Sequence, residues 1–177
     1  MNNYVEIPKR VHQNIKTTND RPYDVNNINK IIYLLEMQSD NLSDKQIASI
    51  VGNIIEESGG DPDAVSPGNK FSGLLQMSEE RANGKTLEEQ VTEIINTIHN
   101  LEDRKSWNKG KAYKSLKEAY SDFMSDDLET INKGFTIGYV RPKGGMHSAK
   151  NRFKVAEQVH TLIKPKEIFN FNPEWQN

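Results

Sequence analysis

The strongest constraint on the fold is a series of apolar stripes that recur at three- and four-residue steps along most of the chain. In the stretch 43–58 the stripe consists of Ile47, Ile50, Val51, Ile54 and Ile55. This spacing places the side chains on one face of a helix. Equivalent stripes predict helices over 25–40, 86–101, 112–123 and 125–135, and a last helix between Gly145 and Pro165.

Two of the predicted helices begin at capping boxes. Ser43 is followed by Gln46, and Thr86 is followed by Glu89. In this pattern each side chain satisfies a free backbone N–H group of the other residue. Prolines and glycines in 61–79 exclude a long helix there, so we expect irregular backbone or short strands. The predicted fold class is α+β, predominantly α, with one short β or irregular element.

The length of 177 residues fits one domain with terminal extensions. Residues 1–24 are polar and lack a sustained apolar period. We interpret them as an N-terminal arm or linker that packs on the domain or joins it to something larger. Residues 25–165 are predicted to form the domain, and residues 166–177 a C-terminal tail.

The composition excludes several classes of function. The absence of cysteine rules out disulfide scaffolds, thiolate zinc sites and cysteine nucleophiles. A net charge of −2 gives no electrostatic footprint for nucleic acid, and no apolar run approaches the ~20 residues of a membrane span. The four histidines do not share metal-ligand spacing, so we expect no metal and no cofactor. The first residues lack the basic-then-apolar order of a signal peptide.

The junction at 53–60, Asn-Ile-Ile-Glu-Glu-Ser-Gly-Gly, carries the most chemical information. Its two glycines end the helix, so both glutamates lie in the last helical turn. On a helical wheel Glu57 falls about 20° from Ile50, at the margin of the apolar arc, whereas Glu56 falls about 120° away and is expected in solvent. An apolar neighbourhood and the negative end of a helix both favour a protonated carboxyl. Glu57 is therefore a candidate general acid, and the alternative is a glutamate half-exposed beside the core.

Three segments follow one another in an order that a known family shares. The first is Glu57-Ser58-Gly59, the second is Gly73-Leu74-Leu75-Gln76, and the third runs over 135–142 with Tyr139 and Arg141-Pro142, before Arg152 and Ala156. Over residues 43–163 the chain resembles the phage tail lysozymes. These belong to the lysozyme-like group that includes goose-type lysozymes and lytic transglycosylases. The resemblance implies a lysozyme-like single domain, with the short β or irregular element after the catalytic helix.

The resemblance also implies roles for individual residues. Glu57 matches the catalytic acid, and Ser58 matches the residue that orients this acid. Gln76 matches a glutamine that lines the sugar cleft, and Tyr139 is a candidate aromatic contact there. From the residues alone, Gln76 is equally an ordinary strand-end amide and Tyr139 a core aromatic. Ser58 lies near the middle of the apolar arc, so its hydroxyl is expected to find a buried partner.

The chain departs from the family pattern at Met77, where members often carry Trp, and at Val140, where they often carry an acidic residue. A second catalytic carboxylate is not evident. Asp61 and Asp63 are candidate substrate-site acids, although loop acids beside a proline are usually turn formers. Two routes stay open: attack by a water that these residues or backbone groups hold, or closure of a 1,6-anhydro ring by the muramic acid's own hydroxyl, which needs no second carboxylate.

We predict a peptidoglycan-degrading glycosidase that cleaves the MurNAc–GlcNAc β-1,4 linkage with a single glutamate general acid, as a muramidase or a lytic transglycosylase. The expected partners are glycan strands and, through the arm, other phage structural proteins, with no nucleic acid and no membrane. The expected location is the phage virion, in the tail, or the bacterial cell wall after release. The alternative is a non-catalytic virion structural or cell-wall-binding protein that retains the fold. An open groove with Glu57 at its floor favours the enzyme.

Overall fold

A computed structural model describes residues 6–68, 70–78, 82–102 and 106–163. Within them the fold is a predominantly α, α+β single domain, as the sequence predicts. The predicted C-terminal tail, 166–177, lies outside the described residues. No helix in the described part of the chain combines the length and the hydropathy that a membrane span requires.

Helix α2 (Asp44–Ser58) is the central element, and most of its residues are buried. Its start is the predicted capping box, in which Ser43 Oγ accepts the Gln46 N–H and the Gln46 side chain accepts the Ser43 N–H. Its end is Gly59, which has φ +67° and donates its N–H to the Ile55 carbonyl oxygen. Glycine adopts this left-handed conformation without steric cost, so the helix stops directly after Ser58.

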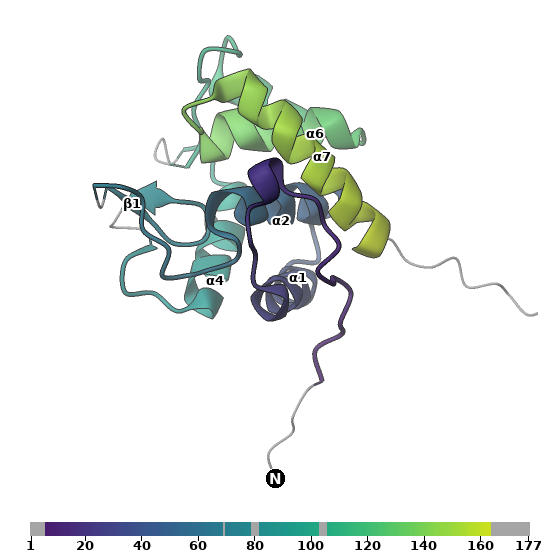
Figure 1. Ribbon diagram of the computed structural model, residues 1–177. Coiled ribbons are helices and arrows are strands. Elements are labelled where there is room, and N and C mark those ends of the chain that lie inside the picture. The colour runs from purple at the N-terminus through teal and green to yellow at the C-terminus, as the bar shows by residue number, and fades with distance from the viewer. Residues whose placement is uncertain (1–5, 69, 79–81, 103–105, 164–177) are drawn as a thin grey trace, which may run out of the picture.

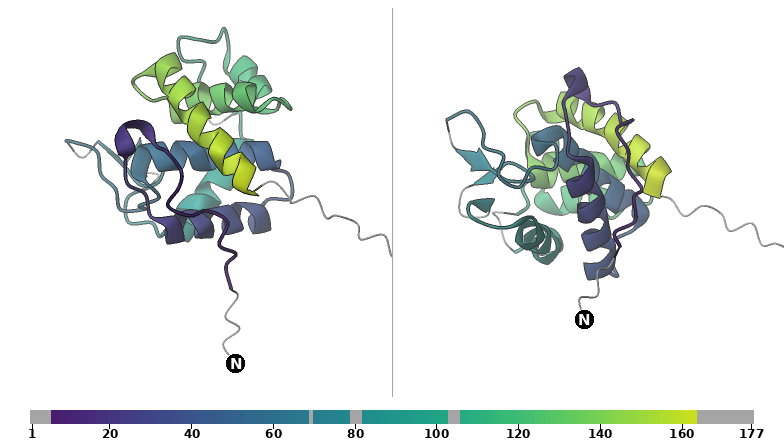
Figure 2. Two further views of the ribbon diagram at one scale, coloured as in Figure 1. Left: turned by 45° about the vertical axis from the view of Figure 1, so that its right-hand side comes forward. Right: turned by 60° about the horizontal axis from the view of Figure 1, so that its bottom comes forward.

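Two helix pairs enclose α2 on opposite sides (Figures 1 and 2). On one side α1 (Val25–Gln38) packs against both α2 and α4 (Leu87–Ile98), which begins at the predicted Thr86 capping box. On the other side α6 (Leu128–Gly134) and α7 (Gly145–Ile163) pack against each other and against α2. The α2–α7 contact is the most extensive of these, so the end of α2 is held in a fixed relation to α7.

The predicted helix 125–135 is divided in the structure. Helix α5 (Leu116–Phe123) precedes it, and α6 begins only after Asp127, whose carboxylate caps the Thr130 N–H. After Gly134 the chain continues as a π-helix, labelled η2 (Phe135–Val140). Arg141, which has φ +59°, ends this element. π-Helical turns are rare and frequently lie at functional sites.

The segment after α2 forms a small antiparallel hairpin, as expected for 61–79. Strand β1 (Phe71–Ser72) pairs with β2 (Met77–Ser78), with Phe71 opposite Ser78 and Ser72 opposite Met77. The hairpin extends to one side of α2 (Figure 1). Its inner residues Leu74 and Leu75 are buried in the core, which fixes the hairpin against the domain.

The arm packs on the domain over its described residues, 6–24. Val11 and Ile15 are buried in the main core, and the backbone N–H groups of Arg10 and Val11 both donate to Asn29 Oδ1 of α1 at 2.8 Å. The arm then forms a 3-10 turn, η1 (Thr18–Asp20), close to the C-terminal end of α2. The arm has no long apolar stripe, and its buried side chains and its hydrogen bonds to α1 therefore hold it on the domain.

Candidate active site

A cleft of about 600 Å³ opens beside the C-terminal turn of α2. The arm lines it at Arg21 and Pro22, and the loop and hairpin over 64–76 form another wall. Segment 140–143, which begins at the last residue of the π-helix, and Arg152 of α7 complete it. A volume of this order is typical of sites that bind small molecules or short polymer segments. The cleft is open rather than filled by side chains.

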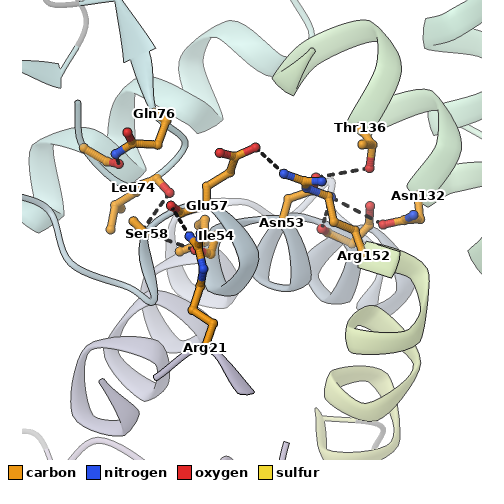
Figure 3. A network of polar contacts seen from close by, with 12 residues as sticks. Arg21, Asn53, Ile54, Glu57, Ser58, Leu74, Gln76, Asn132, Thr136 and Arg152 are labelled. Carbon is orange, nitrogen blue, oxygen red and sulfur yellow. Dashed lines mark hydrogen bonds and ion pairs between the residues drawn. The ribbon is translucent and has the colours of Figure 1, made fainter. Parts of the chain in front are cut away.

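Glu57 lies in the wall of this cleft and faces Arg152 (Figure 3). One Nη of Arg152 donates to Glu57 Oε1 at 2.5 Å, and the two side chains are only 10% and 15% exposed, Arg152 and Glu57 respectively. A charge-assisted contact in so little water is strong. The helical wheel predicts an apolar neighbourhood on one side of Glu57. In the structure the carboxylate also contacts a cation, the guanidinium of Arg152 in the last helix.

The sequence carries a signal for the partner of Glu57 in the apolar stripe of α7. In α7 the buried positions follow a helical stripe that includes Ala149, Arg152, Ala156 and Val159. Arg152 thus occupies a position where the pattern calls for an apolar residue. A charged side chain at such a position requires a buried partner. The stripe indicates that a partner exists, but the tertiary structure is needed to identify it as Glu57.

A buried amide network holds α2 against the elements that face it (Figure 3). Asn53, one helical turn before Glu57, is fully buried, and its Nδ2 donates to Asn132 Oδ1 of α6 at 3.3 Å. The Thr136 hydroxyl of the π-helix donates to Asn53 Oδ1 at 3.1 Å, and Asn132 Nδ2 donates to the Ala149 carbonyl oxygen of α7 at 2.9 Å. Three elements are therefore fixed to α2 next to the catalytic candidate.

Ser58 ties the end of α2 to the hairpin loop. Its hydroxyl lies 2.9 Å from the Leu74 carbonyl oxygen and accepts the Gly60 N–H at 3.2 Å. Leu74 is buried, so the expectation that this hydroxyl finds a buried partner is confirmed. The contact places Ser58 as a link between two walls of the cleft, which fixes the backbone that carries Glu57.

Glu56 is not in solvent, contrary to the helical-wheel expectation. It is 9% exposed, and its Oε1 accepts the Thr18 N–H of the arm at 2.7 Å. The wheel considers only the helix itself, whereas here the arm covers the face opposite the apolar arc. Arg21 of the same arm donates to the Glu57 carbonyl oxygen at 2.8 Å. The arm therefore contacts both glutamates.

Gln76 lies in the cleft wall opposite α2, at a strained backbone position with φ +48°. Its Nε2 donates to the carbonyl oxygens of Ala64 and Gly73, both at 3.1 Å. These bonds fix the side chain across the hairpin loop. Its amide oxygen accepts no hydrogen bond from the described residues, so it is available to a ligand hydroxyl.

Tyr139 does not reach the cleft, and this corrects the expectation of an aromatic sugar contact. Its side chain is 1% exposed, and its hydroxyl lies 2.6 Å from Thr97 Oγ1 of α4. The ring packs against Trp107 and stacks on Phe135, with ring centroids 5.5 Å and 5.0 Å away. The π-helix turns this residue into the aromatic core, which is the alternative that the residues alone had left open.

Asp61 and Asp63 lie in the turn after α2 rather than in the cleft wall. Asp61 Oδ1 accepts the Asp63 N–H at 2.8 Å, the arrangement of a turn-forming aspartate. Asp61 lines a neighbouring hollow beside the start of α1, and both side chains are exposed. Among the described lining residues the carboxylates are those of Glu56 and Glu57. Glu56 is turned to the backbone of the arm, whereas Glu57 contacts a side chain of the cleft lining, Arg152, so Glu57 is the better placed of the two to meet a ligand.

The two positions that depart from the family pattern fall in different places. Val140 lines the cleft, whereas Met77 packs against the core on the other side of the hairpin, near Ala82 and Ile94. Within the described ranges no group of three or more His, Cys, Asp or Glu residues is arranged to hold a metal ion. The described chemistry of the cleft therefore comes from one carboxylate, a set of cations and the Gln76 amide.

Comparison with known proteins gives one match. A model of the phage tail lysozyme family matches residues 27–163, which is most of the chain and includes α2, the hairpin, the π-helix and α7. Searches of curated proteins and of solved structures found no match. The matched range begins after the arm, although the arm contributes Arg21 and Pro22 to the cleft.

Proposed function

The chain belongs to the phage tail lysozyme family, and we propose that it cleaves the MurNAc–GlcNAc β-1,4 linkage of peptidoglycan with Glu57 as the proton donor. Membership indicates a lysozyme-like, peptidoglycan-lytic function, with peptidoglycan as the substrate and association with the virion. The linkage, the residue and the reaction type go beyond membership. The observation that carries them is Glu57 in the wall of an open cleft, with little exposure and a fixed backbone.

In this proposal Glu57 gives its proton to the glycosidic oxygen as the bond to the muramic acid breaks. In the structure this carboxyl group is held by Arg152, which donates to Glu57 Oε1 at 2.5 Å. Ser58 acts as a positioning residue, because it joins the backbone of α2 to the Leu74 carbonyl oxygen. Gln76 offers its amide oxygen, which accepts no hydrogen bond from the described residues, to a sugar hydroxyl across the cleft. Neither Tyr139 nor the two turn aspartates has a role in this scheme.

Two outcomes of bond cleavage are consistent with a single carboxylate. A water molecule adds to the muramic acid and gives a hydrolytic product, or the sugar's own 6-hydroxyl closes an anhydro ring while Glu57 returns as the base. The second outcome needs no further carboxylate, and the described cleft lining offers none beyond the engaged Glu56. We propose this ring closure as the route that the geometry supports better.

The test is digestion of purified peptidoglycan by the wild type and by Glu57→Gln, with the fragments read by mass spectrometry. We expect Glu57→Gln to release muropeptides at least ~100-fold more slowly, because general acid catalysis contributes at this level. Anhydro ends in the wild-type products would identify a lytic transglycosylase, and ends that carry an added water would identify a muramidase.

Glu56→Gln is the matched control. It makes the same chemical change at the adjacent residue, and its amide oxygen can still accept the Thr18 N–H. We expect it to retain most of the activity. If neither the wild type nor Glu56→Gln releases fragments from walls of several bacterial types, the protein is a structural or wall-binding relative that has kept only the fold.

We also propose that the virion carries this chain to the wall, with the arm as the segment next to other phage structural proteins. The net charge of −2 supports delivery by the particle, since such a chain has no general attraction to an acidic wall. The arm packs on the domain through Val11 and Ile15, so a partner would meet an ordered surface. Crosslinking of assembled particles at Lys9 or Lys16 would identify that partner.

A further inference from the structure

Arg152 has more hydrogen-bond donors than its contact with Glu57 uses. A guanidinium carries five N–H donors, and one of them is bound to Glu57 Oε1. The other donors have no acceptor among the described residues, and the Nε group is fully buried. A nine-tenths buried cation in a cleft wall with unused donors is costly unless a ligand or water supplies acceptors.

The cleft is positively charged, although the chain carries a net charge of −2. Four cationic side chains line it, from the arm, from segment 140–143 and from α7, against the two adjacent glutamates of α2. Lys143 is exposed at the rim and forms no ion pair within the described part of the chain. Cations of one sign in a concave site raise the local concentration of anions. The chemistry of the site therefore suits a ligand that carries a carboxylate.

The contact with Arg152 also opposes the role of Glu57 as an acid. The contact occupies Glu57 Oε1, whereas a general acid must lie within hydrogen-bond reach of the glycosidic oxygen when the bond breaks. When the strand is in the cleft, an anion on the substrate can bind Arg152 in place of Glu57. The Glu57 carboxyl group is then released from Arg152 and can face the strand. The unused donors of Arg152 are the means by which such an anion can be received.

We propose that Arg152, with Lys143 at the rim, forms a subsite for a carboxylate of the glycan strand, and that this carboxylate replaces Glu57 as the partner of Arg152. The inference rests on the proposed function, because it takes a peptidoglycan strand as the occupant. Two carboxylates of the strand have this chemistry: the lactyl group of muramic acid when it is free of peptide, and the carboxylates of the stem peptide when one is attached. Arginine binds either with two parallel N–H bonds.

The experiment measures binding separately from cleavage, with the full chain. Glu57→Gln removes the competing carboxylate and keeps an amide oxygen that can accept from Arg152. Its affinity for purified glycan strands is compared with its affinity for the same strands after their carboxyls have been converted to neutral methylamides. We expect the carboxylated strands to bind roughly tenfold more tightly, the range of a charge-assisted hydrogen bond.

Two further binding comparisons identify the protein residue that binds the carboxylate and the part of the strand that supplies it. In Glu57→Gln/Arg152→Gln the preference for carboxylated strands is expected to disappear. Strands that an amidase has stripped of stem peptides carry only the lactyl carboxylate, so a preference that survives stripping assigns the subsite to the lactyl group, and one that is lost assigns it to the stem peptide. Equal binding of carboxylated and methylamidated strands by Glu57→Gln overturns the proposal, and so does a preference that persists without Arg152.

Arg152 is buried, so its substitution can impair folding, and Lys143 provides a second variant. Lys143 is exposed, and Glu57→Gln/Lys143→Gln is expected to bind carboxylated strands about threefold less tightly than Glu57→Gln, with methylamidated strands unaffected. An unchanged preference in this variant contradicts the subsite. Failure of the proposed function is seen separately, as a wild type that releases no muropeptides, and it leaves the binding preference measurable.

Discussion

Gly52 of α2 lies directly against the backbone of Ala156 in α7. A Cβ added at Gly52 would lie 2.9 Å from the Ala156 nitrogen and 3.0 Å from its Cα, closer than real Cβ contacts. The two helices can therefore approach each other only because this position has no side chain. The approach occurs one turn and a half before Glu57 and one turn after Arg152, so it sets how these two side chains meet.

Gly52→Ala is expected to destabilise the protein by about 1–3 kcal/mol, the usual cost of overpacking a close contact. The direction of the change in the free energy of unfolding is informative, because alanine in a helix is otherwise favoured over glycine by about 1 kcal/mol. Urea denaturation measures the change, and Lys154→Ala on the exposed face of α7 is the control, expected within about 0.5 kcal/mol of the wild type. A more stable Gly52→Ala protein would contradict the close approach.

Glu56→Ala is expected to loosen the arm. The substitution leaves the Thr18 N–H without its acceptor, at a cost of about 1–2 kcal/mol. Limited proteolysis within the arm, together with urea denaturation, measures the effect. Glu56→Gln keeps an oxygen that can accept the same N–H and should resist the protease like the wild type. Equal cleavage of the alanine and glutamine variants would show that this bond does not hold the arm.

Tyr139→Phe is expected to affect stability and not activity. It removes the hydroxyl that contacts Thr97 Oγ1, which costs about 1 kcal/mol, and it leaves the packing of the ring on Phe135 in place. The rate of muropeptide release should stay within about twofold of the wild type. A large loss of activity with unchanged stability would return Tyr139 to the substrate site.

Asp127 is expected to contribute to the loss of stability in acid. The Thr130 hydroxyl and then the Thr130 N–H lower the pKa of this capping carboxylate below 3.8. A carboxyl with a lower pKa in the folded state than in the unfolded state stabilises the fold above the unfolded pKa, and this contribution is lost as the pH falls from about 4 towards the folded pKa. Thermal unfolding at pH 5 and pH 3 measures it.

Asp127→Asn is the matched variant, because asparagine caps a helix about as well as aspartate but does not titrate. We expect its melting temperature at pH 5 to be close to that of the wild type and to fall less between pH 5 and pH 3. A fall of the same size in both proteins would mean that other carboxylates account for the acid response.

Most of the fold is encoded in local sequence patterns. The capping boxes at Ser43 and Thr86 form as predicted, and Gly59 ends α2 with the expected left-handed conformation. These features depend on groups within four residues of each other, so the sequence contains all of their partners. Two predicted helices differ from the structure. The helix expected over 112–123 begins only at Leu116, after the cap Ser115. In the stretch 125–135 Asp127 sets the first turn, and after Gly134 the chain continues as a π-helix.

At the candidate site, local sequence patterns predict some features and miss those that depend on distant residues. The position of Glu57 in the last turn of α2 follows from the sequence alone, as does the need of the Ser58 hydroxyl for a partner. The burial of Glu56 by the arm, the burial of Tyr139 in the aromatic core and the contact of Arg152 with Glu57 do not. Helical periodicity says which face of a helix is apolar but not which distant residue lies against it.

The sequence by itself therefore determined most of the helices, the capped starts of α2 and α4 and the position of the proposed general acid, Glu57, in the last turn of α2, because short-range hydrogen bonds and apolar periodicity fix each of these features. Only the tertiary structure decided what surrounds that carboxylate. Arg152 is 95 residues away from Glu57 along the chain, and the two meet because Gly52 lets α7 approach α2 and the Asn53 network fixes their relation. The strength and direction of an electrostatic contact depend on distance and burial, and both arise only when the elements pack.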